Sequence, residues 1–204
     1  GKAKALNAAI YSSIGTYIIN IDSDGILEKN ALLNMVLRFE NQPQIAALTG
    51  TILPQASRIK AQKDSRLKLL QVNEYFEYAR AFLSGRTIES RRNRLFTMSG
   101  AFSAFRKSSL LSTFLYNTET IGEDTDITFQ LRDRLKERVE ICTDAIFYIE
   151  PIPSLNSLYQ QRQRWQRGEV EVVEQHHQNL GLNSFFSNFL VRRMMIDHTF
   201  VFPQ

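Results

Sequence analysis

The spacing of apolar and polar positions alternates along the first part of the chain between helical and strand periods. Helical faces are followed by short runs rich in isoleucine, leucine and alanine. The predicted order is helix, strand, helix, strand, at residues 2–13, 17–22, 28–39 and 45–53. This alternation is typical of an α/β protein with a largely parallel sheet flanked by helices.

The pattern continues with longer elements. A helix is predicted for residues 64–83, and its stripe of Leu67, Leu70, Phe76 and Ala79 is expected to pack on the sheet. Residues 84–93 are polar and rich in arginine, which favours a loop. A further helix over residues 120–136 and a strand over 139–149 are expected to follow, with Ile127, Phe129 and Leu131 as buried positions.

Two carboxylates, Asp22 and Asp24, stand directly after the strand predicted for residues 17–22. The carboxyl ends of strands are where ligands bind in open α/β sheets. Two acids held this close suit a hard divalent cation such as Mg²⁺ or Mn²⁺ with phosphate oxygens. An Asp-Ser-Asp-Gly sequence is also an ordinary solvated turn, so both interpretations stay open.

A second acidic group, Glu123 and Asp124, opens the helix predicted for residues 120–136. Acids in a first turn are favoured by the helix dipole, so plain capping is one interpretation. The other is that a carboxylate fixed beside a crevice acts as a general base on a substrate hydroxyl.

Gln161, Arg164 and Trp165 fall at i, i+3 and i+4 on one face of a predicted helix. An amide, a guanidinium and an indole on one face offer phosphate pairing and a flat stacking surface. A solvated helix with one aromatic anchor and a nucleic-acid surface are the alternatives.

The C-terminal residues 185–202 are strongly apolar but interrupted by Arg192, Arg193 and Asp197. They are expected to form an amphipathic helix on a membrane surface or the approach to a spanning helix, with a core helix as the alternative. We therefore divide the chain into a catalytic domain, residues 1–168, and a membrane-interface helical segment, residues 169–204.

Composition adds limits to this picture. The chain has 204 residues, a formal net charge of +4 and one cysteine, Cys142. It is globular in composition, weakly suited to an anionic partner, and without an internal disulfide. His176, His177 and His198 lack the spacing of metal ligands, so packing or surface roles are expected.

Five motifs in order resemble the family 2 inverting glycosyltransferases. They are Gly1–Asn7 with Lys2, Asp22-Ser-Asp24, Ser99-Gly100-Ala101-Phe102, Gly122-Glu123-Asp124 and Gln161-x-x-Arg164-Trp165. The match is most similar to the membrane-embedded processive branch, the cellulose, hyaluronan and poly-N-acetylglucosamine synthases. It spans nearly the whole chain.

The resemblance implies a GT-A-type fold and transfer from a UDP-sugar, leaning to N-acetylglucosamine or glucose, to a glycan acceptor. By the same resemblance Lys2 contacts the diphosphate, Asp24 and Asp22 hold Mg²⁺ or Mn²⁺, and Asp124 is the general base beside Glu123. Gln161, Arg164 and Trp165 would bind pyrophosphate and the acceptor sugar. Ser99, Gly100, Ala101 and Phe102 would line the acceptor path.

The chain also departs from the family pattern. The nucleotide-binding strand that precedes the lysine motif is missing from this sequence, so the fragment is expected to bind UDP weakly by itself. Gly122 stands where threonine is common, a change expected to matter little to Asp124.

We expect a cell-membrane protein with its catalytic domain on the cytoplasmic face and no nucleic-acid partner, since Asp22, Asp24 and Asp124 would repel a phosphate backbone. A nucleotide-sugar-binding module without turnover and a basic RNA-binding domain are the alternative functions.

Overall fold

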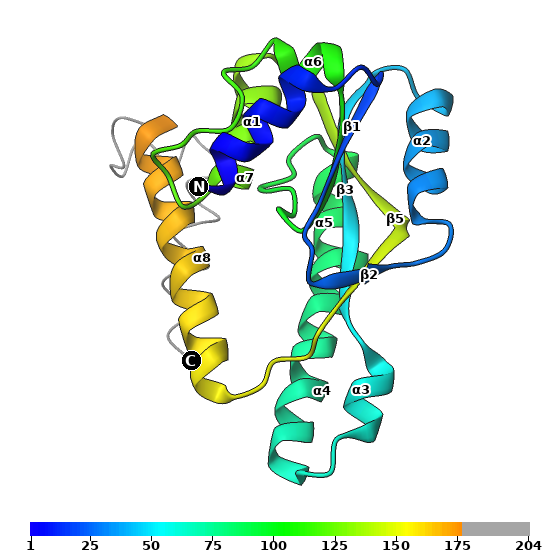
Figure 1. Ribbon diagram of the computed structural model, residues 1–204, viewed down its shortest axis with the longest axis vertical. Coiled ribbons are helices and arrows are strands. Elements are labelled where there is room, and N and C mark those ends of the chain that lie inside the picture. Colours follow the sequence, from blue (N-terminus) through cyan, green and yellow to red (C-terminus); the bar gives the residue numbers. More distant parts are fainter. Residues whose placement is uncertain (177–204) are drawn as a thin grey trace.

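The computed structural model describes residues 1–176, which form a five-stranded sheet flanked by helices (Figure 1). Across the sheet the strand order is β1-β4-β3-β5-β2. The strands are β1 (Tyr17–Ile21), β2 (Gly25–Leu27), β3 (Ile45–Pro54), β4 (Phe102–Arg106) and β5 (Arg138–Ile149). The predicted α/β class is confirmed.

The sheet is mixed, and the expectation of a mostly parallel sheet is wrong for these strands. β3 and β5 are parallel, but β4 is antiparallel to both β1 and β3, and β2 is antiparallel to β5. A parallel neighbour requires that the crossover return the chain to the end where the previous strand began. Here the helical segment after β3 is followed by residues 92–101, which run back along the sheet, so β4 enters in the opposite direction (Figure 1).

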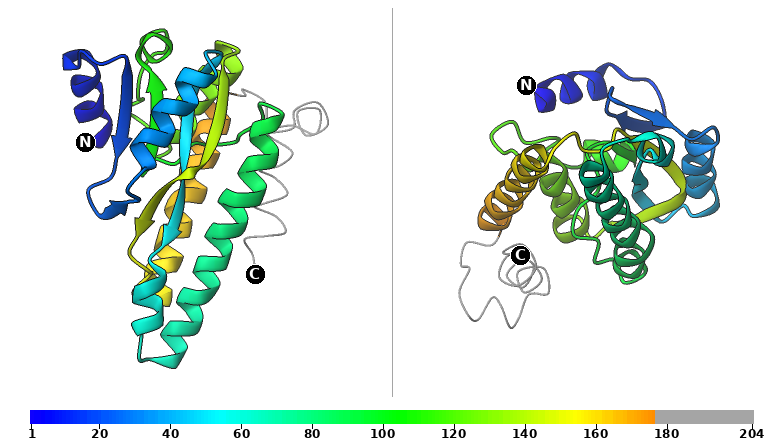
Figure 2. Two further views of the ribbon diagram at one scale, coloured as in Figure 1. Left: turned by 90° about the vertical axis from the view of Figure 1, so that its right-hand side faces the viewer. Right: turned by 90° about the horizontal axis from the view of Figure 1, so that it is seen from below.

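The helices predicted for residues 2–13, 28–39, 64–83 and 120–136 are present. The helices of the first half are α1 (Lys2–Ser12), α2 (Ala31–Asn41), α3 (Ala56–Ala61), α4 (Ser65–Arg80), the π-helical turn η1 (Ala81–Gly85) and α5 (Arg86–Arg91). The later ones are α6 (Lys107–Leu111), α7 (Glu123–Phe129), the π-helical turn η2 (Gln130–Arg134) and α8 (Leu155–His176). The short helices α3, α5 and α6 were not predicted. In the left view of Figure 2, β3 and β5 lie between α1 on one side and α4 to α5 on the other.

The core is centred on β3, which is buried along its whole length. Met35 and Phe39 of α2 pack with Phe102 and Phe147 of the sheet in one cluster of fully or nearly fully buried side chains. A second cluster contains Ile127 and Leu131, which confirms their predicted burial, as does Phe129 with no exposed surface. Apolar burial on this scale is the main term that stabilises the fold.

Two local predictions on the long helical segment are wrong. Phe76 is 66% exposed, and α4 instead buries Gln71, Glu74 and Tyr78. The reason is that the Gln71 amide donates to the Ile152 carbonyl at 2.9 Å and Glu74 accepts from the Ile152 N–H at 2.9 Å.

Residues 84–93 are mostly helical and not a loop, because η1 and α5 prolong α4 to Arg91. Phe82 and Ser90 are buried within this segment. The Ser90 hydroxyl accepts from the Ile141 N–H at 3.0 Å, which ties α5 to β5. Tertiary contacts therefore override the low helix propensity of serine and glycine.

α8 runs without interruption from Leu155 to His176, so the domain boundary placed at residue 168 lies inside this helix. Among residues 1–176, no helix is long and apolar enough to cross a membrane. The apolar stretch of residues 185–202 lies outside the described residues, as do His177 and His198.

Candidate functional site

The first part of the site forms where the start of α1 meets the carboxyl end of β1. The Lys2 Nζ donates to Asp22 Oδ1 at 2.6 Å and to the Gly100 carbonyl at 3.2 Å. Asn20, at the end of β1, donates to the same carbonyl at 3.3 Å. The Asp22 N–H donates to Ala101 O at 2.9 Å, which extends the pairing of β1 with β4. Lys2 and Asp22 are thus joined to the Ser99–Phe102 motif.

Gly100 also joins this group to the predicted base. Its N–H donates to Asp124 Oδ2 at 3.1 Å, while Asp124 Oδ1 accepts from the Thr125 N–H at 2.8 Å. A Cβ on Gly100 would lie 3.2 Å from Asp124 Oδ2, so glycine allows the close approach of this carboxylate. Both oxygens of Asp124 therefore accept backbone N–H groups, one of them in the first turn of α7.

The acidic pair at the start of α7 is partly buried. Burial raises the pKa of Asp124, and the two backbone N–H bonds and the positive charge of Arg86 oppose this. Burial is also the main cause of the raised pKa of Glu123, with a further contribution from neighbouring Asp124. A carboxyl group with a raised pKa is a better proton acceptor when it is deprotonated, which suits a general base.

The remaining residues of the Ser99–Phe102 motif have different environments. The Ser99 N–H donates to the Thr49 hydroxyl at 2.9 Å, and Ser99 and Ala101 are partly buried. Phe102 has no exposed surface and packs against Phe147 in the core, with the ring centroids 6.1 Å apart. The side chain of Phe102 is therefore part of the core and does not line the acceptor path.

Gln161, Arg164 and Trp165 are carried by α8, as the helical spacing predicted. Trp165 is 37% exposed and packs edge-on against Tyr78 of α4, with the ring centroids 6.3 Å apart. Arg164 is exposed and makes no hydrogen bond or ion pair with the other described residues, and the buried Gln161 Oε1 finds no donor among them. Arg164 is thus open to a ligand, whereas Gln161 Oε1 is buried and the Arg162 guanidinium lies 4.6 Å from the Trp165 ring centroid.

α8 approaches the acidic pair at one backbone contact. Gly168 lies against Gly122, and a Cβ on Gly168 would be 3.0 Å from the Gly122 Cα. Arg164 and Trp165 precede Gly168 by one helical turn, about 5.4 Å along the axis. Asp124 follows Gly122 by two residues. The structure thus joins Lys2, Asp22 and Asp124 through Gly100 and brings α8 against the start of α7 at Gly168.

Arg86 belongs to this region, although it lies in none of the five motifs. It begins α5, its guanidinium lies 4.1 Å from the centroid of the Phe82 ring, and its charge acts on Asp124. The sequence signal was its helical spacing from Tyr78 and Phe82, which places all three on one face. Its relation to Asp124 arises from tertiary structure.

Asp22 and Asp24 fit a divalent cation only if water and substrate phosphates supply the remaining ligands. Residues 1–176 contain no group of three His, Cys, Asp or Glu side chains placed to hold a metal ion. Mg²⁺ is commonly held by one or two carboxylates together with water and substrate phosphates, and two aspartates supply that donor set. Asp24 is exposed and without a partner among the described residues, while Asp22 is paired with Lys2.

Residues 17–202 match the family model described as glycosyl transferase family group 2, and the chain belongs to this family. The fold is the GT-A type. A mannosyltransferase from Pyrobaculum calidifontis, solved with GDP-Man and Mn²⁺, superposes with a TM-score of 0.65 at 16% identity over 98% of this chain and 50% of that one. Mannosyl-3-phosphoglycerate synthase from Rubrobacter xylanophilus gives 0.52 at 10% identity over 90% of this chain and 54% of that one.

Curated relatives are more similar in sequence. The poly-beta-1,6-N-acetyl-D-glucosamine synthase of Staphylococcus aureus strain COL is 30% identical over 95% of this chain and 42% of its own length. The enzyme of the same name from Staphylococcus epidermidis is 26% identical over 96% of this chain and 43% of its own length. The chain therefore spans less than half of the curated relatives that it matches.

Proposed function

We propose that this chain is the catalytic part of an inverting glycosyltransferase that moves N-acetylglucosamine from UDP-N-acetylglucosamine to a growing glycan. The single observation that supports it most is the hydrogen-bonded connection of Lys2 and Asp22 to Asp124 through Gly100. Asp22 and the candidate base Asp124 are 102 positions apart in the sequence. Gly100 connects them, because it bonds both Asp124 and Lys2, the partner of Asp22. The choice of donor sugar rests on the names of the curated relatives.

In this proposal Asp124 accepts the proton of the acceptor hydroxyl while that oxygen attacks the anomeric carbon. The raised pKa of Asp124 supports this role. Lys2 and Arg164 carry positive charge toward the diphosphate, where negative charge grows as the sugar–phosphate bond breaks. Attack and departure on opposite faces of the sugar invert the anomeric carbon in one displacement.

The other predicted residues receive supporting roles. Asp22 and Asp24 would hold Mg²⁺ or Mn²⁺, which when bound neutralises charge on the departing diphosphate. Trp165 would lie near the acceptor sugar, with the Arg162 guanidinium 4.6 Å from its ring centroid, and Gln161 would act on the same face of α8. Ser99, Gly100 and Ala101 would lie along the acceptor path. Association with the cytoplasmic face of the cell membrane is part of the same proposal.

The test is sugar transfer by the full-length protein in membranes, with a panel of UDP-sugars and with Mg²⁺, Mn²⁺ or a chelator. Asp124→Asn keeps the size of the side chain and removes its basicity, so turnover is expected to fall by at least about 100-fold, as for the loss of a general base. Equal turnover by Asp124→Asn would refute the assignment of the base. Binding of UDP-sugar without transfer by the wild type would refute the enzymatic function.

A further inference from the structure

α8 meets the start of α7 through two glycines. A Cβ on Gly122 would lie 2.6 Å from the Gly168 carbonyl oxygen, and one on Gly168 would lie 3.0 Å from the Gly122 Cα. The first distance excludes a Cβ unless the backbone moves, and the second requires a backbone shift of a few tenths of an ångström. In both cases the neighbouring atom is backbone, which yields less than a flexible side chain. Gly122 therefore does more than replace a threonine, because the two backbones touch here.

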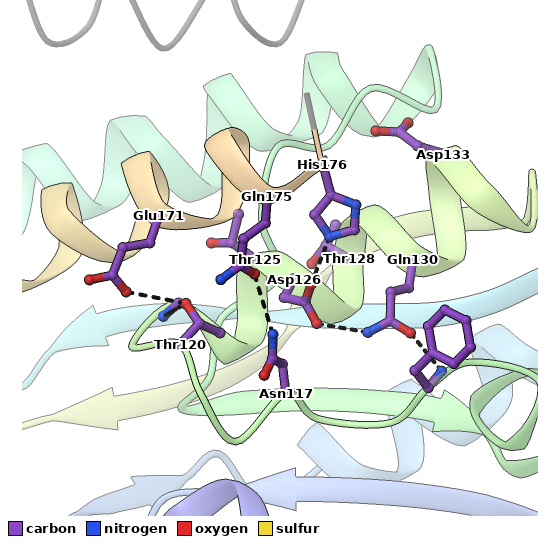
Figure 3. Close-up of polar contacts among 12 residues, drawn as sticks. Asn117, Thr120, Thr125, Asp126, Thr128, Gln130, Asp133, Glu171, Gln175 and His176 are labelled. Atoms are coloured by element: carbon purple, nitrogen blue, oxygen red, sulfur yellow. Dashed lines mark hydrogen bonds and ion pairs between the residues drawn. The ribbon is translucent and has the colours of Figure 1, made fainter. Parts of the chain in front are cut away.

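A second contact lies two turns further along α8 (Figure 3). His176 Nε2 is 2.7 Å from Asp126 Oδ1, and the other oxygen of Asp126 accepts from the Gln130 amide at 2.7 Å. Asp126 and Gln130 are 4% and 3% exposed. Burial of a carboxylate is costly unless its oxygens are bonded, so this network is specific in geometry.

Gln130 extends the network to the segment that leads into α7. The side-chain oxygen Oε1 of Gln130 accepts from the Phe114 N–H at 2.7 Å. The side-chain nitrogen Nε2 donates to the backbone carbonyl of Leu115 at 3.1 Å. Leu115 has a φ of 60°, a left-handed conformation that is unfavourable for leucine and is held here by the surrounding bonds. His176 is thus connected to the backbone that precedes Gly122.

We propose that the Gly122–Gly168 contact and the His176–Asp126–Gln130 network form a two-point joint that fixes Arg164 and Trp165 relative to Asp124. The two contacts lie eight residues apart, about 12 Å along the helix axis, and between them Glu171 Oε2 accepts from the Ile121 N–H at 3.3 Å. Nearer its start, α8 is also held to α4 by the Arg162–Glu77 ion pair at 2.7 Å, so the two contacts fix the part of α8 that meets α7. Gly168 and His176 are then positioning residues, and their catalytic meaning rests on the function proposed above.

The joint is tested in the full-length protein in membranes with Gly168→Ala and His176→Ala. Turnover is expected to fall about 10- to 100-fold in each, as for displacement of a reacting group by roughly 1 Å. Gly85→Ala is the matched control, because a Cβ there meets nothing closer than the Arg80 carbonyl at 3.8 Å. His176→Gln keeps an N–H donor for Asp126 and is expected to retain turnover within about threefold of wild type.

Three measurements separate positioning from general packing. A positioning role lowers kcat more than it raises KM for the donor, lowers turnover by more than the loss of thermal stability accounts for, and is rescued by glutamine. Normal turnover in Gly168→Ala and His176→Ala, with Asp124→Asn inactive, overturns the joint while the proposed function stands. Equal losses in His176→Gln and His176→Ala, a matching loss in Gly85→Ala, or losses that follow thermal stability also overturn it.

Amide hydrogen exchange decides the joint independently of sugar transfer. His176→Ala is expected to speed exchange in residues 113–130 and leave the peptides of β3 unchanged. If the wild type transfers no sugar, the proposed function fails, and faster exchange in residues 113–130 still supports the joint. Unchanged exchange there overturns it.

Discussion

Replacement of Lys2 by methionine tests whether Lys2 serves ligand binding or the stability of the fold. Lys2 and Asp22 form an ion pair at 2.6 Å, with side chains that are 42% and 34% exposed. In water this separation corresponds to about 1.6 kcal/mol of Coulomb attraction, and exposed pairs of this kind are measured at about 0.2 to 1 kcal/mol after screening and side-chain entropy. The free energy of unfolding is therefore expected to change by less than about 1 kcal/mol.

The effect of Lys2→Met on sugar transfer is expected to be much larger. If Lys2 faces the donor diphosphate, the variant loses a charge-assisted hydrogen bond of about 1.5 to 3 kcal/mol. That loss corresponds to a fall in kcat/KM for the UDP-sugar of roughly 10- to 100-fold. Methionine keeps the length and apolar stem of lysine, so packing around the start of α1 changes little.

Initial rates with the full-length protein and the thermal midpoint of the purified protein give the two quantities. Lys60→Met is the matched control, because Lys60 is exposed on α3 and its ammonium has no partner among the described residues. Turnover within threefold of wild type would refute the role of Lys2 at the diphosphate. A fall of the midpoint by more than about 4 °C would indicate a cost above 1 kcal/mol and a structural role instead.

Two further predictions concern buried carboxyl groups. The charge of Arg86 lowers the pKa of Asp124, so Arg86→Gln raises it further and should move the acidic limb of the kcat/KM profile to higher pH. An unmoved limb with unchanged turnover would contradict this coupling. Burial raises the pKa of Glu74, so the folded state binds its proton more tightly than the unfolded state. The stability contributed by protonated Glu74 is therefore lost as pH rises from about 4.5 through the raised pKa. Glu74→Gln keeps an acceptor for the Ile152 N–H without the charge, so its stability should fall less than that of wild type over this range in denaturant titrations. Parallel curves for the two proteins would refute the assignment.

The residue pattern predicts most of the elements because they carry their own periodicity. β3 is an example, since it is buried along its whole length. α2 forms where its period predicts it, with Met35 and Phe39 in the core, although Leu32, Leu33 and Leu37 are exposed. The direction of β4 was not predictable from the pattern, because it depends on the path of residues 92–101 and not on the strand itself. The buried face of α4 was missed because Gln71 and Glu74 are polar, and their partner Ile152 lies far along the chain.

The site is a similar case. Asp22, Asp124 and the α8 motif are recognisable by residue type and order, and Gly100 connects Asp124 to Lys2, the ion-pair partner of Asp22. His176 was expected to have a packing or surface role, and its bond to Asp126 agrees with a packing role. Arg86 and the Gly122–Gly168 contact were missed, because a sequence without three-dimensional distances does not indicate which glycine meets which backbone.

The three glycines of the site bring backbone close to the acidic pair at the start of α7. At Gly100 the absent Cβ admits the carboxylate of Asp124, and at Gly122 and Gly168 it admits a second backbone. The backbone N–H groups of Gly100 and Thr125 hold the two oxygens of Asp124, which limits the rotamers of its side chain. Fixed dipoles and charges that need no reorganisation are what stabilise a transition state most effectively. A substitution at any of the three should therefore reduce turnover more than stability, whereas a substitution of Phe102 beneath them should do the reverse.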